Sequence, residues 1–217
     1  MAGDLIVSTI NGGAIGTKNV IINGNFGINQ RAVTGSVVLS AGVYGHDRFK
    51  AGASGCSYTF ATSANVTTLT ISAGSLIQVV EGINLQTGTY TLSWTGTAQG
   101  KIGGGSYASS GTTGSATGGT NLNVEFNTGT ISLVQLEAGS SATEFEHRQY
   151  GTELGLCQRY YQQPIDSGLD FFAGYFVTGN YGASVFNTWV VEMRATPTVV
   201  LTLGTLNSVG SVSVNYF

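Results

Sequence analysis

Hydrophobic and polar residues alternate in short stretches along the first two thirds of the chain. A period of two places one side chain in a core and the next in solvent, which is typical of β-strands with one buried face. No long helical pattern separates these stretches, so neighbouring strands have to pair mostly antiparallel. The pattern predicts an antiparallel β-sandwich with strands at 19–23, 36–40, 57–61, 67–72, 75–80, 89–95, 121–127 and 130–137.

The last of these strands changes its pattern halfway along. Ile131 and Leu133 fall on one face by strict alternation, whereas Leu136 falls on the other face. A change of face within one strand indicates an extra residue in the ladder. We therefore predict a β-bulge near Val134.

The sandwich is flanked by three further segments. A helix is predicted at 151–163, because Leu154, Cys157 and Tyr161 recur at helical spacing before Pro164. Residues 1–18 are too short to fold alone and are predicted to be an anchoring arm. The sandwich itself should span 19–150. A C-terminal β segment at 164–217 has strand patterns at 169–178, 183–192, 198–203 and 208–217.

The C-terminal β segment is small for an independent core. Its many aromatic residues suggest that it packs on the sandwich or on other copies of the chain. This step predicts a homo-oligomer, with a trimer favoured.

Composition supports the strands and limits the partners. The chain has 33 glycines among 217 residues, 9% charged residues and a net charge of −3. Its 8 basic residues are scattered, so no patch can neutralise several phosphates, and nucleic acid is excluded as a partner. A neutral ligand such as a glycan, or another protein, is expected instead.

The glycine-rich stretch at 103–119 is predicted to be a loop, either mobile, ordered by a partner or in contact with a glycan.

Cysteine usage and hydropathy bear on the compartment. Cys56 and Cys157 are far apart in sequence and are expected to be buried free thiols rather than a disulfide. No apolar run reaches about 18 residues, so membrane insertion is not expected. The first residues lack the basic and apolar regions of a secretory signal. We expect a protein made in a cytoplasm that remains there or leaves by a route such as virion assembly and lysis.

Several sequence motifs follow one another in a fixed order. The most informative closes the sandwich: a strand LVQLEAG at 133–139, then FEHR at 145–148 and LCQRYY at 156–161. The others are NVIINGNFGINQR at 19–31, YGHDRF at 44–49, IQVVEG at 77–82, YTLSW at 90–94 and MRATPTV at 193–199.

Together these motifs resemble those of bacteriophage tail-fibre and other virion surface proteins that carry a jelly-roll sandwich similar to carbohydrate-binding modules. The chain departs from that pattern where Phe49 replaces the usual Trp, His46 replaces Ala, and Glu144 and Gln149 replace Pro. The resemblance implies a jelly-roll fold, a place on the virion after synthesis in the host cytoplasm, and other virion proteins as partners. It does not by itself imply a sugar ligand.

Catalysis finds little support in the sequence. A glycosidase needs two carboxylates about 5–10 Å apart, but most of the 11 acidic residues lie in turns or in the motifs, and Asp166 and Asp170 have no obvious partner. His46 and His147 also lie inside motifs, and no G-x-S-x-G elbow occurs. Clustered Cys and His ligands for a metal are absent, although a calcium bound by loop oxygens stays open. We predict no enzyme, no catalytic residue, no cofactor and no metal site.

Two sets of residues are candidates for function. Exposed aromatic rings near polar side chains bind sugars, and Tyr44, Tyr107 and Tyr181 fit this description, whereas Trp94 and Trp189 are assigned to packed strands. The second set belongs to the motifs and could form either a ligand-binding cluster or structural staples, of which staples are favoured in so charge-poor a chain. This set comprises Asp47, Arg48, Gln135, Glu137, Phe145, Glu146 and Arg148.

The favoured function is a structural protein of a phage virion, in a tail fibre or another surface fibre, that contributes to attachment to a host glycan. Two alternatives stay open: a tailspike-like depolymerase acting on host polysaccharide, and a purely architectural decoration of the capsid or baseplate. Binding of glycans without turnover would support the favoured function, release of reducing sugar would support the depolymerase, and neither result would favour the architectural role.

Overall fold

The computed structural model describes residues 9–10, 13–14, 18–163, 174–177, 180–183 and 190–198, with side chains at 18–163 and 190–198. The chain divides into two compact units, Met1–Cys157 and Gln158–Phe217. The first unit contains an antiparallel sheet of eight strands. These are β3 (Val37–Leu39), β4 (Phe49–Ser63), β5 (Val66–Val80), β6 (Gly88–Thr95), β7 (Gly100–Ile102), β8 (Thr112–Ala116), β9 (Leu122–Phe126) and β10 (Gly129–Ala138).

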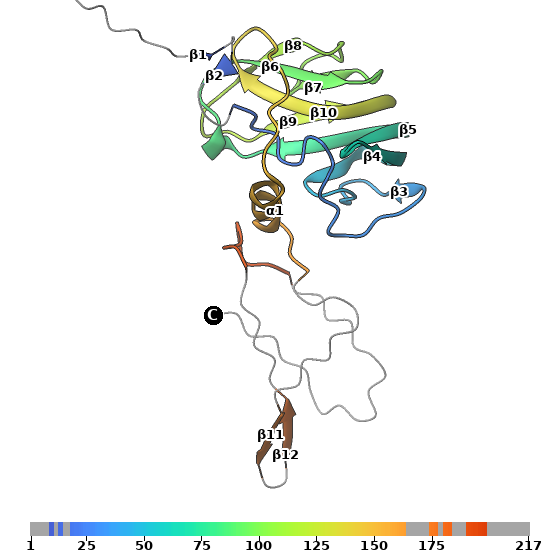
Figure 1. Ribbon diagram of the computed structural model, residues 1–217, viewed down its shortest axis with the longest axis vertical. Coiled ribbons are helices and arrows are strands. Elements are labelled where there is room, and N and C mark those ends of the chain that lie inside the picture. Colours follow the sequence, from blue (N-terminus) through green and yellow to red (C-terminus); the bar gives the residue numbers. More distant parts are fainter. Residues whose placement is uncertain are drawn as a thin grey trace, which may run out of the picture. The chain divides into compact units, whose positions relative to one another are not determined.

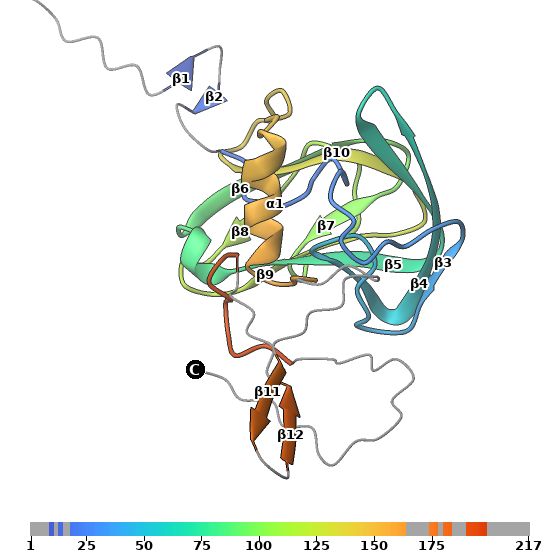
Figure 2. The same ribbon diagram turned by 60° about the horizontal axis from the view of Figure 1, so that its bottom comes forward.

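The sheet folds over into two layers that share β10 (Figures 1 and 2). Residues 129–131 of β10 pair with β5, and residues 132–138 pair with β6. One layer has the order β3-β4-β5-β9-β7, and in the other layer β6 lies between β10 and β8. The predicted fold class, an antiparallel sandwich-like all-β fold followed by a short helix, is confirmed.

A β-bulge marks the point where β10 leaves one layer for the other. The register of β10 against β6 shifts between Ser132 and Gln135, and Leu133 adopts a φ of 51°. The bulge predicted near Val134 is therefore confirmed. Leu133 is half-buried in the bulge, whereas Val134 and Leu136 are fully buried between the layers.

The core lies between the two layers and receives side chains from both. Trp94 on β6 is buried, donates its indole N–H to the Ala98 carbonyl oxygen (3.1 Å) and meets the Phe126 ring edge-on at 5.2 Å. The assignment of Trp94 to the core is confirmed, whereas Trp189 lies outside the described residues. Other fully buried members are Phe26, Phe49, Tyr58, Leu69, Ile71, Leu76, Leu92, Val124, Ile131 and Leu136.

Two predicted strands form a single one. The patterns at 67–72 and 75–80 belong to β5, which pairs along its length with the equally long β4. Gly74 interrupts the alternation between them, with a φ of 70° and a Cβ position only 2.0 Å from the Gly55 carbonyl oxygen. The interruption is a local irregularity that glycine accommodates, rather than a break between strands.

The glycine-rich stretch at 103–119 is more ordered than a loop, which corrects the prediction. Residues 112–116 form β8 and pair with β6 from Gly88 to Leu92. Ahead of β8, Gly100 and Ala108 exchange both backbone hydrogen bonds at 2.9 Å. The sequence here lacks the large apolar side chains that normally mark a strand, so alternation could not reveal it.

The strand predicted at 19–23 is not formed, although Ile21 and Ile22 are buried. Val20 donates its N–H to the Leu136 carbonyl oxygen at 2.9 Å. The Gln78 side-chain amide, however, accepts the Ile22 N–H and donates to the Ile22 carbonyl oxygen, each at 2.8 Å. Side chains thus replace most of the ladder bonds that a strand would need.

The helix and the second unit complete the fold. Helix α1 covers Tyr150–Gln158, so it ends before the 163 predicted. The Arg159 carbonyl oxygen, which a longer helix would pair with residue 163, accepts the Arg194 N–H at 2.9 Å instead. In the regions expected to be strands at 169–178 and 183–192, the structure describes β11 (Gly174–Val177), which pairs with β12 (Asn180–Ala183), and a bend at 190–191.

Some predictions cannot be compared with the fold. Pro164 and the strands expected at 198–203 and 208–217 lie outside the described residues, apart from Thr198. The arm expected at 1–18 is described mainly as β1 (Thr9–Ile10), which pairs with β2 (Gly13–Ala14). Within the described residues, no helix combines the length and apolar character that crossing a membrane requires.

Candidate functional site

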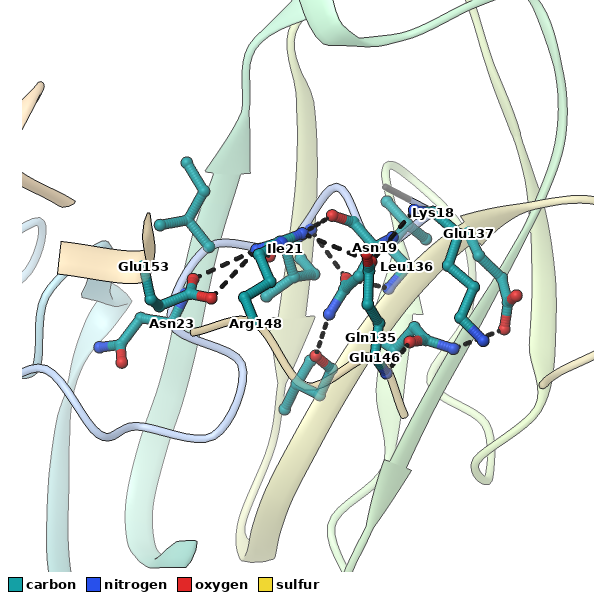
Figure 3. A network of polar contacts seen from close by, with 12 residues as sticks. Lys18, Asn19, Ile21, Asn23, Gln135, Leu136, Glu137, Glu146, Arg148 and Glu153 are labelled. Carbon is teal, nitrogen blue, oxygen red and sulfur yellow. Dashed lines mark hydrogen bonds and ion pairs between the residues drawn. The ribbon is translucent and has the colours of Figure 1, made fainter. Parts of the chain in front are cut away.

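Most of the motif residues singled out in the closing segment meet in one cluster of polar contacts, shown in Figure 3. We call it the anchoring network. It joins the segment at 18–23 to β10, to the exit loop at 143–148 and to α1. Its members are Asn19, Asn23, Gln135, Glu137, Glu146, Arg148 and Glu153.

Arg148 is the centre of the anchoring network. Its guanidinium donates to the carbonyl oxygens of Ile21 (3.0 Å) and Asn19. It also pairs with the Glu153 carboxylate on α1 at 3.2 Å and with Glu146 at 3.9 Å. The Arg148 side chain is 7% exposed, so these charge-assisted bonds are made largely out of water, where they are stronger than on a surface.

The two motif carboxylates of the anchoring network, Glu137 and Glu146, also accept hydrogen bonds from their own chain. Glu146 accepts the backbone N–H groups of Lys18 (3.0 Å) and Asn19 (2.7 Å). Glu137 accepts the N–H (2.8 Å) and the hydroxyl (2.6 Å) of Thr143. Gln135 links the two, because it accepts the Glu146 N–H and donates to Glu137, each at 2.8 Å. These contacts fix the exit loop against β10.

Asp47 and Arg48 lie in a second cluster next to the first. Asp47 accepts the N–H (2.6 Å) and the side-chain amide (2.7 Å) of Gln30, and Arg31 lies 3.6 Å away. Burial raises the pKa of Asp47, against the opposing effect of these partners. Arg48 has a φ of 71° and donates to the Val79 carbonyl oxygen at 2.6 Å. Asn23 connects this cluster to the anchoring network through its bond to the Asp47 carbonyl oxygen.

Sequence reasoning did not single out three residues that complete these clusters. Asn19 uses its side chain to bond Ile21, Val134 and Leu136, at 2.9–3.1 Å. Gln78 and Glu153 hold Ile22 and Asn23 in the same way. The signal that could have revealed Gln78 is its position as a polar residue inside an apolar run.

Phe145 is the one apolar member of the motif set. Its ring meets the His147 ring edge-on at 4.9 Å and is half-buried. It also packs over Gly24, where a Cβ would stand 3.3 Å from the ring. Phe145 therefore covers the segment that the anchoring network holds.

Of the three candidate tyrosines, Tyr107 has the most polar surroundings. The Lys101 ammonium lies 4.6 Å from the centre of its ring and pairs with Glu125 at 2.9 Å. Burial alone would raise the pKa of Glu125, but hydrogen bonds with Ser75, Lys101 and Tyr107 outweigh it and lower that pKa. Tyr107 is half-buried and held by the paired backbone of Gly100 and Ala108.

Tyr44 and Tyr181 lie elsewhere. The Arg31 guanidinium lies 5.3 Å from the centre of the half-buried Tyr44 ring. Tyr181 is on β12 in the second unit, and its side chain is outside the described ones. The structure thus places Tyr44 and Tyr107 in one unit, each with a cation against its ring.

Both cysteines are free and buried, as predicted. Burial raises the pKa of the Cys56 thiol to about 11 and raises that of Cys157 further, so both remain protonated thiols near neutral pH. Among the described residues, no three His, Cys, Asp or Glu side chains are grouped to hold a metal ion.

Comparisons with protein-family models, with curated protein sequences and with solved structures find no match to this chain.

Proposed function

We propose that the chain is a non-catalytic structural protein of a phage virion, carried on a surface fibre and contributing to attachment to the host. The resemblance of the motifs to those of phage virion surface proteins supports the place on a virion fibre. The anchoring network is the observation that carries the non-catalytic part, because its carboxylates accept hydrogen bonds from the chain's own backbone and pair with its own arginine.

A carboxylate that acts as general acid or nucleophile has to face a substrate and exchange protons during the reaction. Glu137 is 3% exposed and Glu153 is 8% exposed, and both are committed to holding the exit loop and the segment at 18–23. These contacts suit a rigid scaffold that presents its surface to a partner.

Two experiments test the proposal. Antibodies against the chain should label purified virions of the phage that encodes it, and the purified full chain should bind host cells without releasing reducing sugar. Labelling with no cell binding would favour the architectural alternative. Release of reducing sugar from host polysaccharide would favour a depolymerase, and absence of the chain from virions would overturn the proposal.

Light scattering tests the oligomer that the proposal includes. Other virion proteins are the expected partners of the arm, and a symmetric homo-oligomer, with a trimer favoured, is the expected assembly. A mass of one chain at all concentrations would contradict that assembly.

A further inference from the structure

The strand register aligns five residues in one row across the outer face of the layer that contains β4, β5, β9 and β7. Residues directly opposite each other in antiparallel strands share a face of the sheet. Each residue of the row is paired with the next by the register. We call this the outer row, which consists of Tyr44, Lys50, Ile77, Glu125 and Lys101.

The outer row faces away from the core. Phe49, Leu76 and Phe126, which alternate with members of the row along the strands, are fully buried between the layers. All five members of the row are half-buried, so each keeps part of its surface in water. With neighbouring strands about 4.8 Å apart, the row is roughly 19 Å long.

A tyrosine stands at each end of the outer row. Tyr44 begins it, and Tyr107 lies over its last member, with the Lys101 ammonium 4.6 Å from the ring centre. The Arg31 guanidinium holds the Tyr44 ring in a similar way at 5.3 Å. Rings that are already held by a cation lose little conformational freedom when a ligand binds.

The charges along the outer row are not balanced. Glu125 neutralises Lys101 at 2.9 Å, whereas Lys50 makes no salt bridge within the part of the chain that the structure describes. Lys50, which the register places opposite both Tyr44 and Ile77, is complementary to a ligand that carries a negative charge beside apolar C–H groups.

We propose that the outer row, with Tyr107, is a binding surface for an extended acidic saccharide, rather than for the neutral ligand that the net charge of the chain suggested; this inference rests on the proposed role in host attachment. Sugar rings present C–H faces that pack on tyrosine rings and hydroxyls that bond to side chains such as Glu125. A carboxylate on a sugar near the Tyr44 end pairs with Lys50. The paired Lys101 and Glu125 then orient Tyr107 at the far end of the ligand.

A glycan array that contains each acidic linear glycan beside its methyl-esterified form tests the proposal with the full chain. Binding to acidic glycans should be at least ten-fold tighter than to their esters. Tyr44→Ala and Tyr107→Ala should each weaken binding at least ten-fold, and Tyr107→Phe should retain most of it. Lys50→Gln should bind acidic and esterified forms equally.

Thr113→Ala, on the exposed side of β8 in the other layer, is the matched control and should bind as the unchanged chain does. Thermal unfolding checks that every variant is folded. Equal binding of acidic and esterified glycans by the unchanged chain, full binding by the tyrosine variants, or no binding to any linear glycan would overturn the outer row as the site. Virion labelling and cell binding measured with these same variants would show whether the chain still attaches to the host when the outer row does not bind glycan.

Discussion

Gly24 lies against Val134 with no room for a side chain. A Cβ on Gly24 would stand 2.1 Å from the Val134 carbonyl oxygen, and Val134 donates its N–H to the Gly24 carbonyl oxygen at 2.8 Å. This contact brings the segment at 18–28 against β10 just where the bulge at Leu133 turns the strand toward the second layer.

Gly24→Ala is therefore expected to destabilise the protein strongly. The new methyl group has to push the segment away from β10 and break the bond to Val134, at a cost of about 3 kcal/mol or more in the free energy of unfolding. Urea denaturation measures this loss. Gly88→Ala is the control, because nothing lies within 4 Å of its Cβ position, and it should change stability by less than about 0.5 kcal/mol.

Arg148→Met should release the segment that the anchoring network holds. It removes the cation from Glu153 and the donors from the Asn19 and Ile21 carbonyl oxygens. Breaking a buried pair costs about 3–5 kcal/mol, and the partial exposure of this pair places the expected loss at about 3 kcal/mol. Hydrogen exchange should speed up at the amides of residues 19–23 more than in β4 and β5.

Lys101→Met is the matched control for the Arg148 change. It breaks the more exposed pair with Glu125, whose side chains are 24% and 18% exposed, and it should cost below about 1 kcal/mol. Equal losses for the two variants would mean that the anchoring network contributes no more than a surface ion pair.

Sequence patterns predicted the strands that have one apolar and one polar face, such as β6 and β9, because alternation reports burial directly. They also predicted the bulge, since Leu136 breaks the alternation set by Ile131. β8 was not predicted, because its only apolar side chain is the small Ala116 and the other residues are threonine, glycine and serine. The segment at 19–23 has a strand pattern, but its backbone N–H groups bond to the side chains of Gln78, Glu146 and Glu153, and no local pattern encodes such distant partners.

In the candidate site, too, some residues could be chosen from their local sequence, whereas others come together only through strand pairing. Tyr107 could be chosen from its position in a polar stretch, and Glu146 and Arg148 from their motif. Lys101, Glu125 and Ser75 could not be chosen with Tyr107, because the pairing of β7, β9 and β5 brings them together. Likewise, the alignment of Tyr44 with Lys50 depends on a single bridge between strands.

Substitutions at Leu133 test the backbone conformation of the bulge. Its φ of 51° is costly for a β-branched residue and easy for glycine or asparagine. Leu133→Val should therefore lower the free energy of unfolding by about 2 kcal/mol, whereas Leu133→Asn should lower it by less than about 1 kcal/mol despite its lost apolar contacts. Urea denaturation of both variants measures the difference, and a more stable Val variant would contradict the bulge geometry.

His46 should make stability depend on pH. It is 1% exposed, shares a hydrogen bond with the Tyr58 hydroxyl at 3.0 Å, and packs on the rings of Phe26 and Phe60. Burial lowers the pKa of His46 from 6.5 to about 4. Between these values the unfolded chain binds a proton that the folded chain does not, so stability falls as the pH falls from about 6.5 to 4. The loss amounts to about 3 kcal/mol.

His46→Ala isolates this contribution. The variant should be less stable than the unchanged protein at pH 7.5, because it loses ring contacts with Phe26 and Phe60, but it should lose less stability between pH 7.5 and 4.5. Burial raises the pKa of Asp47, so this residue stabilises the folded chain more as the pH falls. Its effect is present in both proteins and cancels in the comparison. Urea denaturation at the two pH values measures the slopes, and parallel slopes would show that His46 takes up its proton equally in the folded and unfolded chains.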